Sequence, residues 1–326
     1  MNQVCANRQP TSSVRCQGKR WDSRGPAASL CLAALLAITA VAGAGFEQRV
    51  GAQEKSGPKP PQGFDEPTVT AWKKAGAKVG WLGKIKVGEP GAGGLHFRPT
   101  PDGQEAVVPA FKIASWQEKL LVGLPAPAVP FGLDFYNSSV TDAGLKQLAG
   151  LPSLQSLHLG STKVGDAGLK ELAALNSLQA LDIRKTLVTD AGLKELARLK
   201  GLQLLILAGT KVTDAGLKEL AGLTSLRSLN LFGTEVSDVG LKELGGLNNL
   251  QTLTVPNRVT DTGLKELAGL KSLQALDLAN TRVTDAGLKE LAGLKNLQSL
   301  ILNKTKVTDA GVAELRKALP ACQIVR

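Results

Sequence analysis

From Val140 onward one phrase of sequence recurs, and this repetition constrains the fold more than any other feature. The phrase Val-Thr-Asp-Ala-Gly-Leu-Lys-Glu-Leu-Ala-Gly-Leu is perfect at 212–223 and 283–294, and variants of it begin at Val140, Val164, Val188, Val236, Val259 and Val307. The third position of each phrase is an aspartate, and these are Asp142, Asp166, Asp190, Asp214, Asp238, Asp261, Asp285 and Asp309. Their spacing is constant except for one interval, Asp238 to Asp261, which is shorter by a single position. A fixed period of this size is typical of solenoids, in which each unit packs only against its neighbours.

Each unit carries the pattern of one short strand and one short helix. In the unit that starts at Leu223, Leu229 and Leu231 are two residues apart, so both side chains face the same side of a strand. Leu241 and Leu244 are three residues apart, which places both on one face of a helix. Parallel strands stack about 4.8 Å apart, whereas packed helices need about 8–10 Å. The stack must therefore curve, with strands on the concave side and helices on the convex side.

The unit Leu-x-x-Leu-x-Leu-x-x-Thr-x-Val resembles the leucine-rich repeat, with Thr in the position that is usually Asn or Cys. More narrowly, it resembles the bacterial 24-residue type marked by Thr-Asp-Ala-Gly-Leu, and it is similar to the repeats of ribonuclease-inhibitor-like and F-box-associated leucine-rich repeat proteins. The resemblance covers residues 132–317, about eight repeats. It implies a curved α/β solenoid with parallel strands on the concave face, short helices on the convex face and an N-terminal cap. It also implies that proteins or other macromolecules bind on the concave sheet.

The segment before the repeats begins with the features of an export signal. Residues 1–26 are basic and polar, residues 27–44 are almost entirely apolar, and Gly45 follows a run of small residues. This order predicts a signal peptide over 1–44. Because the apolar run approaches the ~20 residues that span a bilayer, a retained membrane anchor is the alternative. Residues 45–67 are rich in Pro and Gly, which predicts an extended linker.

The two ends of the repeat array need a cover. Residues 68–131 are not repetitive, and they are predicted to form an N-terminal cap on the apolar end of the first repeat. An aromatic ligand pocket is the functional alternative, because this segment holds Trp72, Trp81, Phe97, Phe111 and Trp116. Residues 318–326 depart from the repeat, but Ile324 lies one full repeat period after Leu300. A last strand is therefore predicted to close the stack.

Two columns of residues vary within the monotonous framework, and both are expected to point out of the concave face. The first concave column lies between the two strand leucines and consists of Asp134, His158, Asp182, Ile206, Asn230, Thr254, Asp277 and Ile301. The second concave column lies two residues further on and consists of Tyr136, Gly160, Arg184, Ala208, Phe232, Pro256, Ala279 and Asn303. Tyr, Arg and Phe are common anchors of protein interfaces. Partner contacts are predicted at Asp134, Tyr136, His158, Asp182, Arg184, Ile206, Asn230, Phe232 and Thr254.

One row in the first concave column could carry chemistry. Asp134, His158 and Asp182 follow one another at the repeat period, so they are predicted to be lateral neighbours on adjacent strands. Two carboxylates that flank an imidazole could orient a general base, which leaves a hydrolase using His158 as a remote alternative. No serine or cysteine is clearly aimed at His158, and a hydrogen-bonded row of charges is the preferred interpretation. No catalytic residue, metal site or cofactor is predicted.

The formal net charge of +11 does not by itself indicate nucleic-acid binding. From Lys170 to Lys289, each lysine of the convex helices is followed directly by a glutamate, so the two charges largely cancel. Aromatic residues for base stacking are absent from that face. A solvated surface of mixed charge is therefore expected there.

Taken together, these patterns predict an exported, non-enzymatic scaffold that binds a protein or other macromolecule as a monomer in the periplasm, at the cell surface or in the medium. Two other functions remain open. One is a membrane-anchored structural protein of the cell envelope, in contact with the membrane through 27–44. The other is the substrate-recognition arm of a ubiquitin-ligase-type adaptor, which would need a helical adaptor-binding box before the repeats. The segment 68–129 is too rich in Gly and Pro to suggest such a box.

Overall fold

The computed structural model describes residues 63–84, 95–99 and 107–326 of the chain. The chain divides into two units, Met1–Lys55 and Ser56–Arg326, and all described residues belong to the second. The predicted signal or anchor segment 1–44 and nearly all of the predicted linker therefore lie outside the described residues. Within the described ranges, no helix has the length and apolar character needed to span a bilayer.

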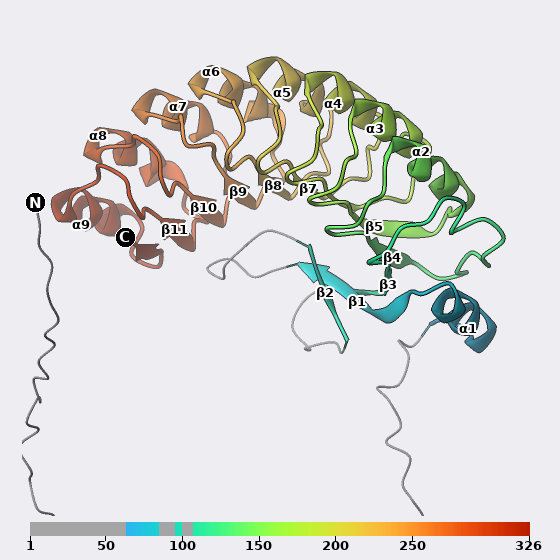
Figure 1. Ribbon diagram of the computed structural model, residues 1–326. Coiled ribbons are helices and arrows are strands. Elements are labelled where there is room, and N and C mark those ends of the chain that lie inside the picture. Colours follow the sequence, from blue (N-terminus) through green and yellow to red (C-terminus); the bar gives the residue numbers. More distant parts are fainter. Residues whose placement is uncertain (1–62, 85–94, 100–106) are drawn as a thin grey trace, which may run out of the picture. The chain divides into compact units, whose positions relative to one another are not determined.

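The repeats build one parallel sheet with helices on a single side. The strands are β4 (Phe131–Asp134), β5 (Leu154–His158), β6 (Ala180–Asp182), β7 (Leu204–Ile206), β8 (Ser228–Asn230), β9 (Thr252–Thr254), β10 (Ala275–Asp277), β11 (Ser299–Ile301) and β12 (Gln323–Val325). They pair in sequence order, and every neighbouring pair is parallel. In Figure 1 the strands line the inner side of an arc and the helices its outer side. The predicted curved α/β solenoid is confirmed.

Each strand from β4 to β11 is followed by a short helix, and in several repeats the helix continues as a 3₁₀ turn. The helices are α2 (Asp142–Leu145), α3 (Asp166–Leu172), α4 (Asp190–Leu196), α5 (Asp214–Leu220), α6 (Asp238–Leu241), α7 (Asp261–Leu267), α8 (Asp285–Leu288) and α9 (Asp309–Ala318). The 3₁₀ turns are η1 (Lys146–Gly150), η2 (Lys242–Gly246) and η3 (Lys289–Gly293). This order of strand and helix is what the leucine spacing predicts.

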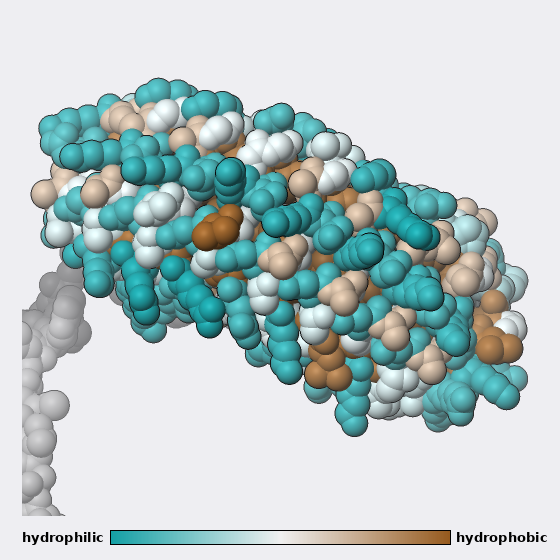
Figure 2. Space-filling model, turned by 90° about the horizontal axis from the view of Figure 1, so that it is seen from above, coloured by the Kyte–Doolittle hydropathy of each residue, from teal (hydrophilic) through white to brown (hydrophobic). Residues whose placement is uncertain are grey.

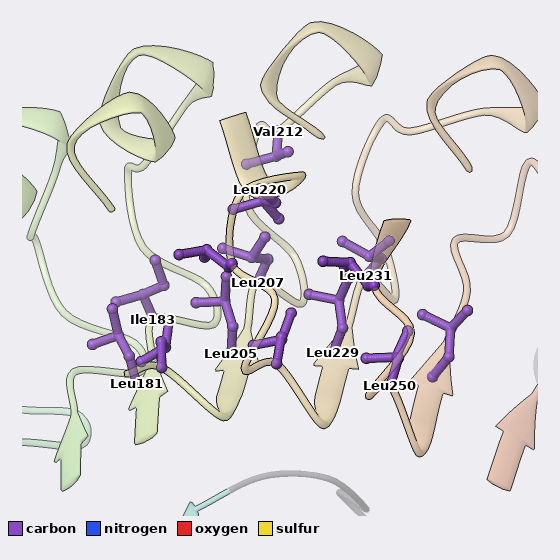
Figure 3. Close-up of a cluster of buried hydrophobic side chains, with 14 of the residues drawn as sticks. Leu181, Ile183, Leu205, Leu207, Val212, Leu220, Leu229, Leu231 and Leu250 are labelled. Carbon is purple, nitrogen blue, oxygen red and sulfur yellow. The ribbon is translucent and has the colours of Figure 1, made fainter. Parts of the chain in front are cut away.

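The leucines of successive strands pack in the interior. Leu181, Leu205 and Leu229 occupy equivalent register positions on β6, β7 and β8. Each of these side chains is at most 1% exposed. Figure 3 shows them in one row, beside a second row made of Ile183, Leu207 and Leu231. Burying one such side chain contributes about 1.5–3 kcal/mol, and the contacts come from neighbouring repeats, so stability is shared along the stack.

The Thr-Asp pair joins each helix to the helix of the next repeat. The threonine is the N-cap, as at Thr213, whose side-chain oxygen accepts a hydrogen bond from the Ala215 N–H at 3.3 Å. Asp190, in the repeat before, accepts from the Thr213 N–H at 2.8 Å and from the Thr213 hydroxyl at 2.6 Å. The same two bonds link the following repeat at Asp166, Asp214, Asp238, Asp261 and Asp285. Ser237 makes the same two bonds in place of a threonine, and Gly165 makes only the backbone bond, to Asp142. The aspartate therefore fixes the distance between neighbouring helices.

The glycine of the Thr-Asp-Ala-Gly-Leu phrase leaves room for this link. A Cβ atom at Gly216 would lie 2.3 Å from Asp190 Oδ1, and one at Gly287 would lie 2.3 Å from Asp261 Oδ1. No side chain tolerates such a contact, so a larger residue would displace the carboxylate from its hydrogen bonds. The phrase as a whole thus encodes one joint between repeats.

The turn after each strand is held by a threonine hydroxyl. These hydroxyls donate to the carbonyl three residues earlier at 2.6–2.7 Å, at Thr162, Thr186, Thr210, Thr234, Thr281 and Thr305. In the shorter repeat around Pro256 the register between β9 and β10 is maintained. The turns of the two neighbouring repeats each contain a residue with positive φ, Gly233 in one and Asn280 in the other. The turn around Pro256 contains no such residue. The missing residue therefore alters the turn and leaves the stack continuous.

The described residues before β4 form α1 (Glu66–Lys74), β1 (Lys78–Lys84), β2 (Leu95–Arg98) and β3 (Val107–Lys112). β3 pairs parallel with β4 and antiparallel with β1, which pairs antiparallel with β2. The sheet thus continues from the repeats into a β1–β2 hairpin. α1 begins inside the segment 45–67, whose last residues the sequence assigned to a linker.

Aromatic rings from this segment cover the start of the first repeat. Trp72 and Phe64 stack on Phe111 with ring centroids 4.3 and 4.5 Å away. All three meet Phe131 of β4 edge-on. Trp72, Phe111 and Phe131 are each 0% exposed. These rings fill the space that the first repeat would otherwise leave open to water.

At the other end, β12 extends the sheet by one strand. Leu300 and Ile324 are register partners on β11 and β12, which confirms the predicted last strand. Cys322 is 7% exposed, and burial raises the pKa of its thiol. A protonated, buried thiol of this kind is unreactive.

Candidate functional site

The first concave column forms as its spacing predicts. The register places Asp134 beside His158, His158 beside Asp182, and Asp182 beside Ile206 on consecutive strands. The column then continues through Asn230, Thr254, Asp277 and Ile301. Residues separated by one repeat period are therefore lateral neighbours on the sheet.

The β1–β2 hairpin lies against the near part of this column. Leu82 of β1 and Leu95 of β2 form one buried apolar cluster with Leu204 and Ile206 of β7. The backbone N–H of Leu95 donates to Asp182 Oδ2 at 3.2 Å. Figure 1 shows both strands beneath the concave side of the arc.

Four of the predicted contact residues are buried as a result. Asp134 is 1% exposed, His158 5%, Asp182 0% and Ile206 1%. The expectation that these side chains face solvent is wrong, because the hairpin of the same chain lies where a partner would have to bind. Nothing in the repeat period indicates this hairpin, since β1 and β2 lie outside the repeats.

The buried charges form a linear network across β4, β5 and β6. Nδ1 of His158 lies 3.3 Å from Asp134 Oδ1, and Nε2 lies 3.4 Å from Asp182 Oδ2. At one end Lys112 Nζ is 3.1 Å from Asp134 Oδ2. At the other end Arg184 Nε is 2.9 Å from both carboxylate oxygens of Asp182. Each carboxylate thus has a cation from its own chain, and the two share the imidazole.

These contacts decide the charge states of Asp134 and Arg184. Burial alone would raise the pKa of Asp134, but the contact and charge of the His158 imidazole, with help from Lys112, hold that pKa below its ordinary value. Burial alone would lower the pKa of Arg184, but Asp182 outweighs it and raises the pKa above its ordinary value. Both side chains therefore stay ionised at neutral pH.

The row does not assemble a nucleophilic site. The groups at the two ring nitrogens of His158 are carboxylates, and among the described residues neither nitrogen has a partner with the alignment of a full hydrogen bond. A hydrolytic base needs a nucleophile within hydrogen-bond reach and access for substrate. The described ranges also contain no group of three side chains arranged to hold a metal ion. What the row does is tie three strands to the hairpin that covers them.

The second concave column presents two aromatic side chains to solvent. Tyr136 and Phe232 are each 42% exposed. Tyr136 also stacks on the His158 ring, with centroids 5.0 Å apart. The predicted third anchor, Arg184, is only 19% exposed at its side chain and is bound to Asp182. The structure thus leaves two of the three predicted anchors available.

Beyond β7 the hairpin cluster no longer covers the sheet. The part of the concave sheet formed by β8 to β12 is called the open concave face below, and its first-column side chains, from Asn230 to Ile301, are half-buried. Asn230 Oδ1 accepts from the Phe232 N–H at 2.9 Å, and Asp277 Oδ1 accepts from the Ala279 N–H at 2.9 Å. Burial raises the pKa of Asp277 above its ordinary value against the opposing effect of that hydrogen bond. No cation of the described residues forms an ion pair with it.

A cleft marks the boundary between the covered and open parts. It has a volume of about 230 Å³. Leu82, Leu95 and Val108 line the side of the N-terminal segment, and Gln179, Gln203 and Arg227 line the side of the sheet. The hairpin therefore rests on the sheet through its apolar cluster without filling the whole concave space.

Comparison with known proteins identifies the repeat. The family model described as "Leucine Rich repeat" matches residues 150–173, 222–245 and 269–292. The chain therefore contains leucine-rich repeats. Among solved structures, it is similar to internalin C2 from Listeria monocytogenes, at 26% identity over 64% of this chain and 84% of that chain, with a TM-score of 0.47. It is also similar to a leucine-rich repeat protein of Leptospira interrogans, at 26% identity over 60% of this chain and 54% of that chain, with a TM-score of 0.45. A search of curated proteins found no match.

The convex face of the repeat array differs from its concave face. Figure 2 shows the molecule from above, where hydrophilic residues cover most of the surface and apolar residues form small separate patches. Val239 of α6, at 72% exposed, is the most exposed large apolar side chain of the described residues. Its repeat neighbours in the helices are alanine or threonine, so no continuous apolar surface forms around it. The exposed aromatic residues lie instead on the concave side.

Proposed function

We propose that this leucine-rich repeat protein is an exported, non-enzymatic scaffold that binds a protein or other macromolecular partner on its concave sheet. The observation that supports this most is the exposure of Tyr136 and Phe232 on one column of an otherwise uniform framework. Repeat proteins commonly use their concave surface to bind partners. The proposed contact set is Tyr136, Asn230, Phe232 and Thr254, with Arg184 between the two aromatic residues in the same column.

The two aromatic side chains are suitably placed for one partner. Tyr136 and Phe232 are four strands apart in the same column, which corresponds to roughly 19 Å at the usual strand spacing. Large aromatic residues supply most of the binding free energy in many interfaces. Thr254, on the strand after β8, offers a hydroxyl group beyond Phe232. A partner that spans the distance from Tyr136 to Phe232 would bury an aromatic anchor at each end.

The export part of the proposal rests on the sequence of residues 1–44. Mass spectrometry of the mature protein from its own host tests it: a mature N-terminus near Gly45 supports export with cleavage. Recovery of the intact leader in the membrane fraction would favour the anchored alternative. Recovery of the intact leader in the cytosol would contradict export.

The binding part is tested by affinity capture from the extract of the producing cells. Phe232→Ala should lower the affinity for the captured partner by roughly thirtyfold, the range seen for interface anchors. Val239→Ala is the matched control, because it removes an exposed apolar side chain from the convex face. Circular dichroism should show the same fold for both variants. Equal capture by wild type and Phe232→Ala would contradict the assignment of this face.

A further inference from the structure

The concave face contains the same strand sequence twice. Ser-Leu-Gln-Ala-Leu-Asp occurs at 177–182 and again at 272–277, and Leu-Gln-x-Leu-Ile-Leu follows in the next repeat both times, at 202–207 and 297–302. The register places the aspartate beside the isoleucine in each copy. Asp182 with Ile206 is called the first Asp–Ile step, and Asp277 with Ile301 the second.

The first Asp–Ile step is occupied by a strand of the same chain. Leu95 of β2 donates its backbone N–H to Asp182, and its side chain packs with Ile206. Arg184, two residues after the aspartate, supplies the cation. With these partners Asp182 is 0% exposed and Ile206 is 1% exposed. The first step therefore shows what this pair of side chains accepts: an extended segment, an aliphatic side chain and a positive charge.

The second Asp–Ile step, on β10 and β11, repeats the strand sequence of the first. Among the described residues it has no covering strand, no aliphatic side chain packed on it from outside the repeats and no cation. Ala279 stands at the position that corresponds to Arg184. Asp277 and Ile301 are half-buried, and no strand of the described residues covers them. Ser299 replaces Leu204, and Ala275 and Ala279 flank the aspartate along the sheet, so the surroundings are small or polar.

The negative charge of Asp277 is not needed for the local fold. Its carboxylate accepts a hydrogen bond from the Ala279 N–H, and Asn230 makes the same bond at the same distance of 2.9 Å with a neutral amide. A half-buried carboxylate without a cation is disfavoured relative to such an amide. The raised pKa of Asp277 has the same cause, since burial penalises its charged form. A cationic ligand would turn this unfavourable charge into a charge-assisted hydrogen bond.

We propose that the second Asp–Ile step binds an extended segment of a partner protein, with a Lys or Arg side chain at Asp277 and an adjacent aliphatic side chain against Ile301. This inference rests on the proposed function and names the chemistry of the partner at one place on the open concave face. The β2 strand at the first step serves as the template for how the segment lies.

The test uses the full-length chain and a display library of random dodecapeptides as the probe. Peptides are selected in parallel on wild type and on Asp277→Asn, which keeps the oxygen that accepts from Ala279. Wild type should enrich peptides with Lys or Arg next to Leu, Ile or Val, and Asp277→Asn should not. A synthetic peptide from the enriched pool should bind Asp277→Asn about tenfold more weakly or worse. Ile301→Ala should also weaken it.

Two controls separate a specific contact from general electrostatics. Glu314→Gln removes one negative charge from the exposed surface of α9 and should leave the affinity for the peptide unchanged. Asp277→Lys should bind a variant of the peptide in which Glu replaces the basic residue. Equal losses for Asp277→Asn and Glu314→Gln would overturn the proposal. So would an enriched pool without basic residues, or no enrichment at all.

Other results would reject this inference and leave the proposed function standing. If the natural partner is lost with Phe232→Ala and retained with Asp277→Asn, then the open face binds but the second step is not the contact. If wild type forms a dimer in sedimentation analysis that Asp277→Asn abolishes, the step belongs to a second copy of this chain. If both Phe232→Ala and Asp277→Asn lose the natural partner, the result supports the proposed function and this inference together.

Discussion

The near and far halves of the concave face share one framework and differ in what lies on it. From β4 to β7 the first-column side chains are buried under the β1–β2 hairpin, and their carboxylates have cations of the same chain. From β8 to β12 the same column is half-buried, and Asp277 has no ion pair within the described residues. This difference shows that strand register alone does not determine whether a residue of the concave face is available to bind a partner. What decides it is whether the chain already occupies the surface.

The largest expected effect comes from removing an aspartate in each half. Asp182→Ala should lower the free energy of unfolding by about 3–5 kcal/mol, because Arg184 and His158 would remain buried without it. Asp277→Ala should change that free energy by less than about 1 kcal/mol, because no partner loses a contact across the sheet. Urea denaturation followed by circular dichroism measures both. Similar losses for the two variants would mean that the halves are equally covered.

A slightly smaller effect is expected from the isoleucines. Ile206→Ala should lower the free energy of unfolding by about 2–4 kcal/mol, since it removes a fully buried side chain from the contact with Leu82 and Leu95. Ile301→Ala should lower it by about 1 kcal/mol, because part of that side chain is already in water. The same denaturation experiment applies. A larger loss at Ile301 than at Ile206 would argue against the hairpin contact.

The framework itself should respond equally in both halves. Asp190→Ala and Asp261→Ala each remove two hydrogen bonds to the next threonine, at Thr213 and Thr284. Each variant should lose about 1–3 kcal/mol of stability. Because the two joints have the same hydrogen bonds, we expect equal losses. Unequal losses would show that the strength of a joint depends on whether the concave surface of that repeat is covered.

The smallest expected effect is on the pH dependence of the free energy of unfolding. Asp134 and Asp277 should contribute to this dependence with opposite signs. The pKa of Asp134 is lowered in the fold, so its carboxylate stabilises the protein above the unfolded value of about 3.9, and that stability is lost as pH falls through the folded pKa. The pKa of Asp277 is raised, so its ionisation weakens the fold as pH rises through about 4 toward the folded pKa.

Variants to Asn isolate these contributions. Relative to wild type, Asp134→Asn should be less destabilised in acid than at neutral pH, whereas Asp277→Asn should gain relative stability as the solution is brought from acid to neutral pH. Chemical denaturation at several pH values between about 3 and 7 measures both trends. The same trend in both variants would contradict the assignment of one paired and one unpaired carboxylate.

The repeat period predicted those features that depend only on residues in equivalent positions of adjacent repeats. Leu181, Leu205 and Leu229 form one buried row, and Asp134, His158 and Asp182 are lateral neighbours, as expected. The last strand at Ile324 was found in the same way. Each of these rests on parallel strands in register, which the alternation of leucines determines.

The cover over the near half could not be predicted from that period. The decisive contact joins Leu95 to Asp182, far apart in the chain, and Leu95 lies in a segment without repeats. No column spacing indicates which side of the sheet a hairpin will choose. The link from each aspartate to the next threonine was also not foreseen, although one signal was present: the aspartate and the glycine two residues later are constant in every full phrase.

The central claim is that the hairpin covers the near half of the concave face, whereas no strand of the described residues covers the far half. Cysteine labelling tests it most directly, with Ile206→Cys and Ile301→Cys in separate variants treated with a maleimide under native conditions. Peptide mass spectrometry reads the labelling at each introduced position. Labelling at position 301 should be faster by about tenfold or more, because position 206 reacts only when the hairpin opens. Equal rates at the two positions would contradict the claim.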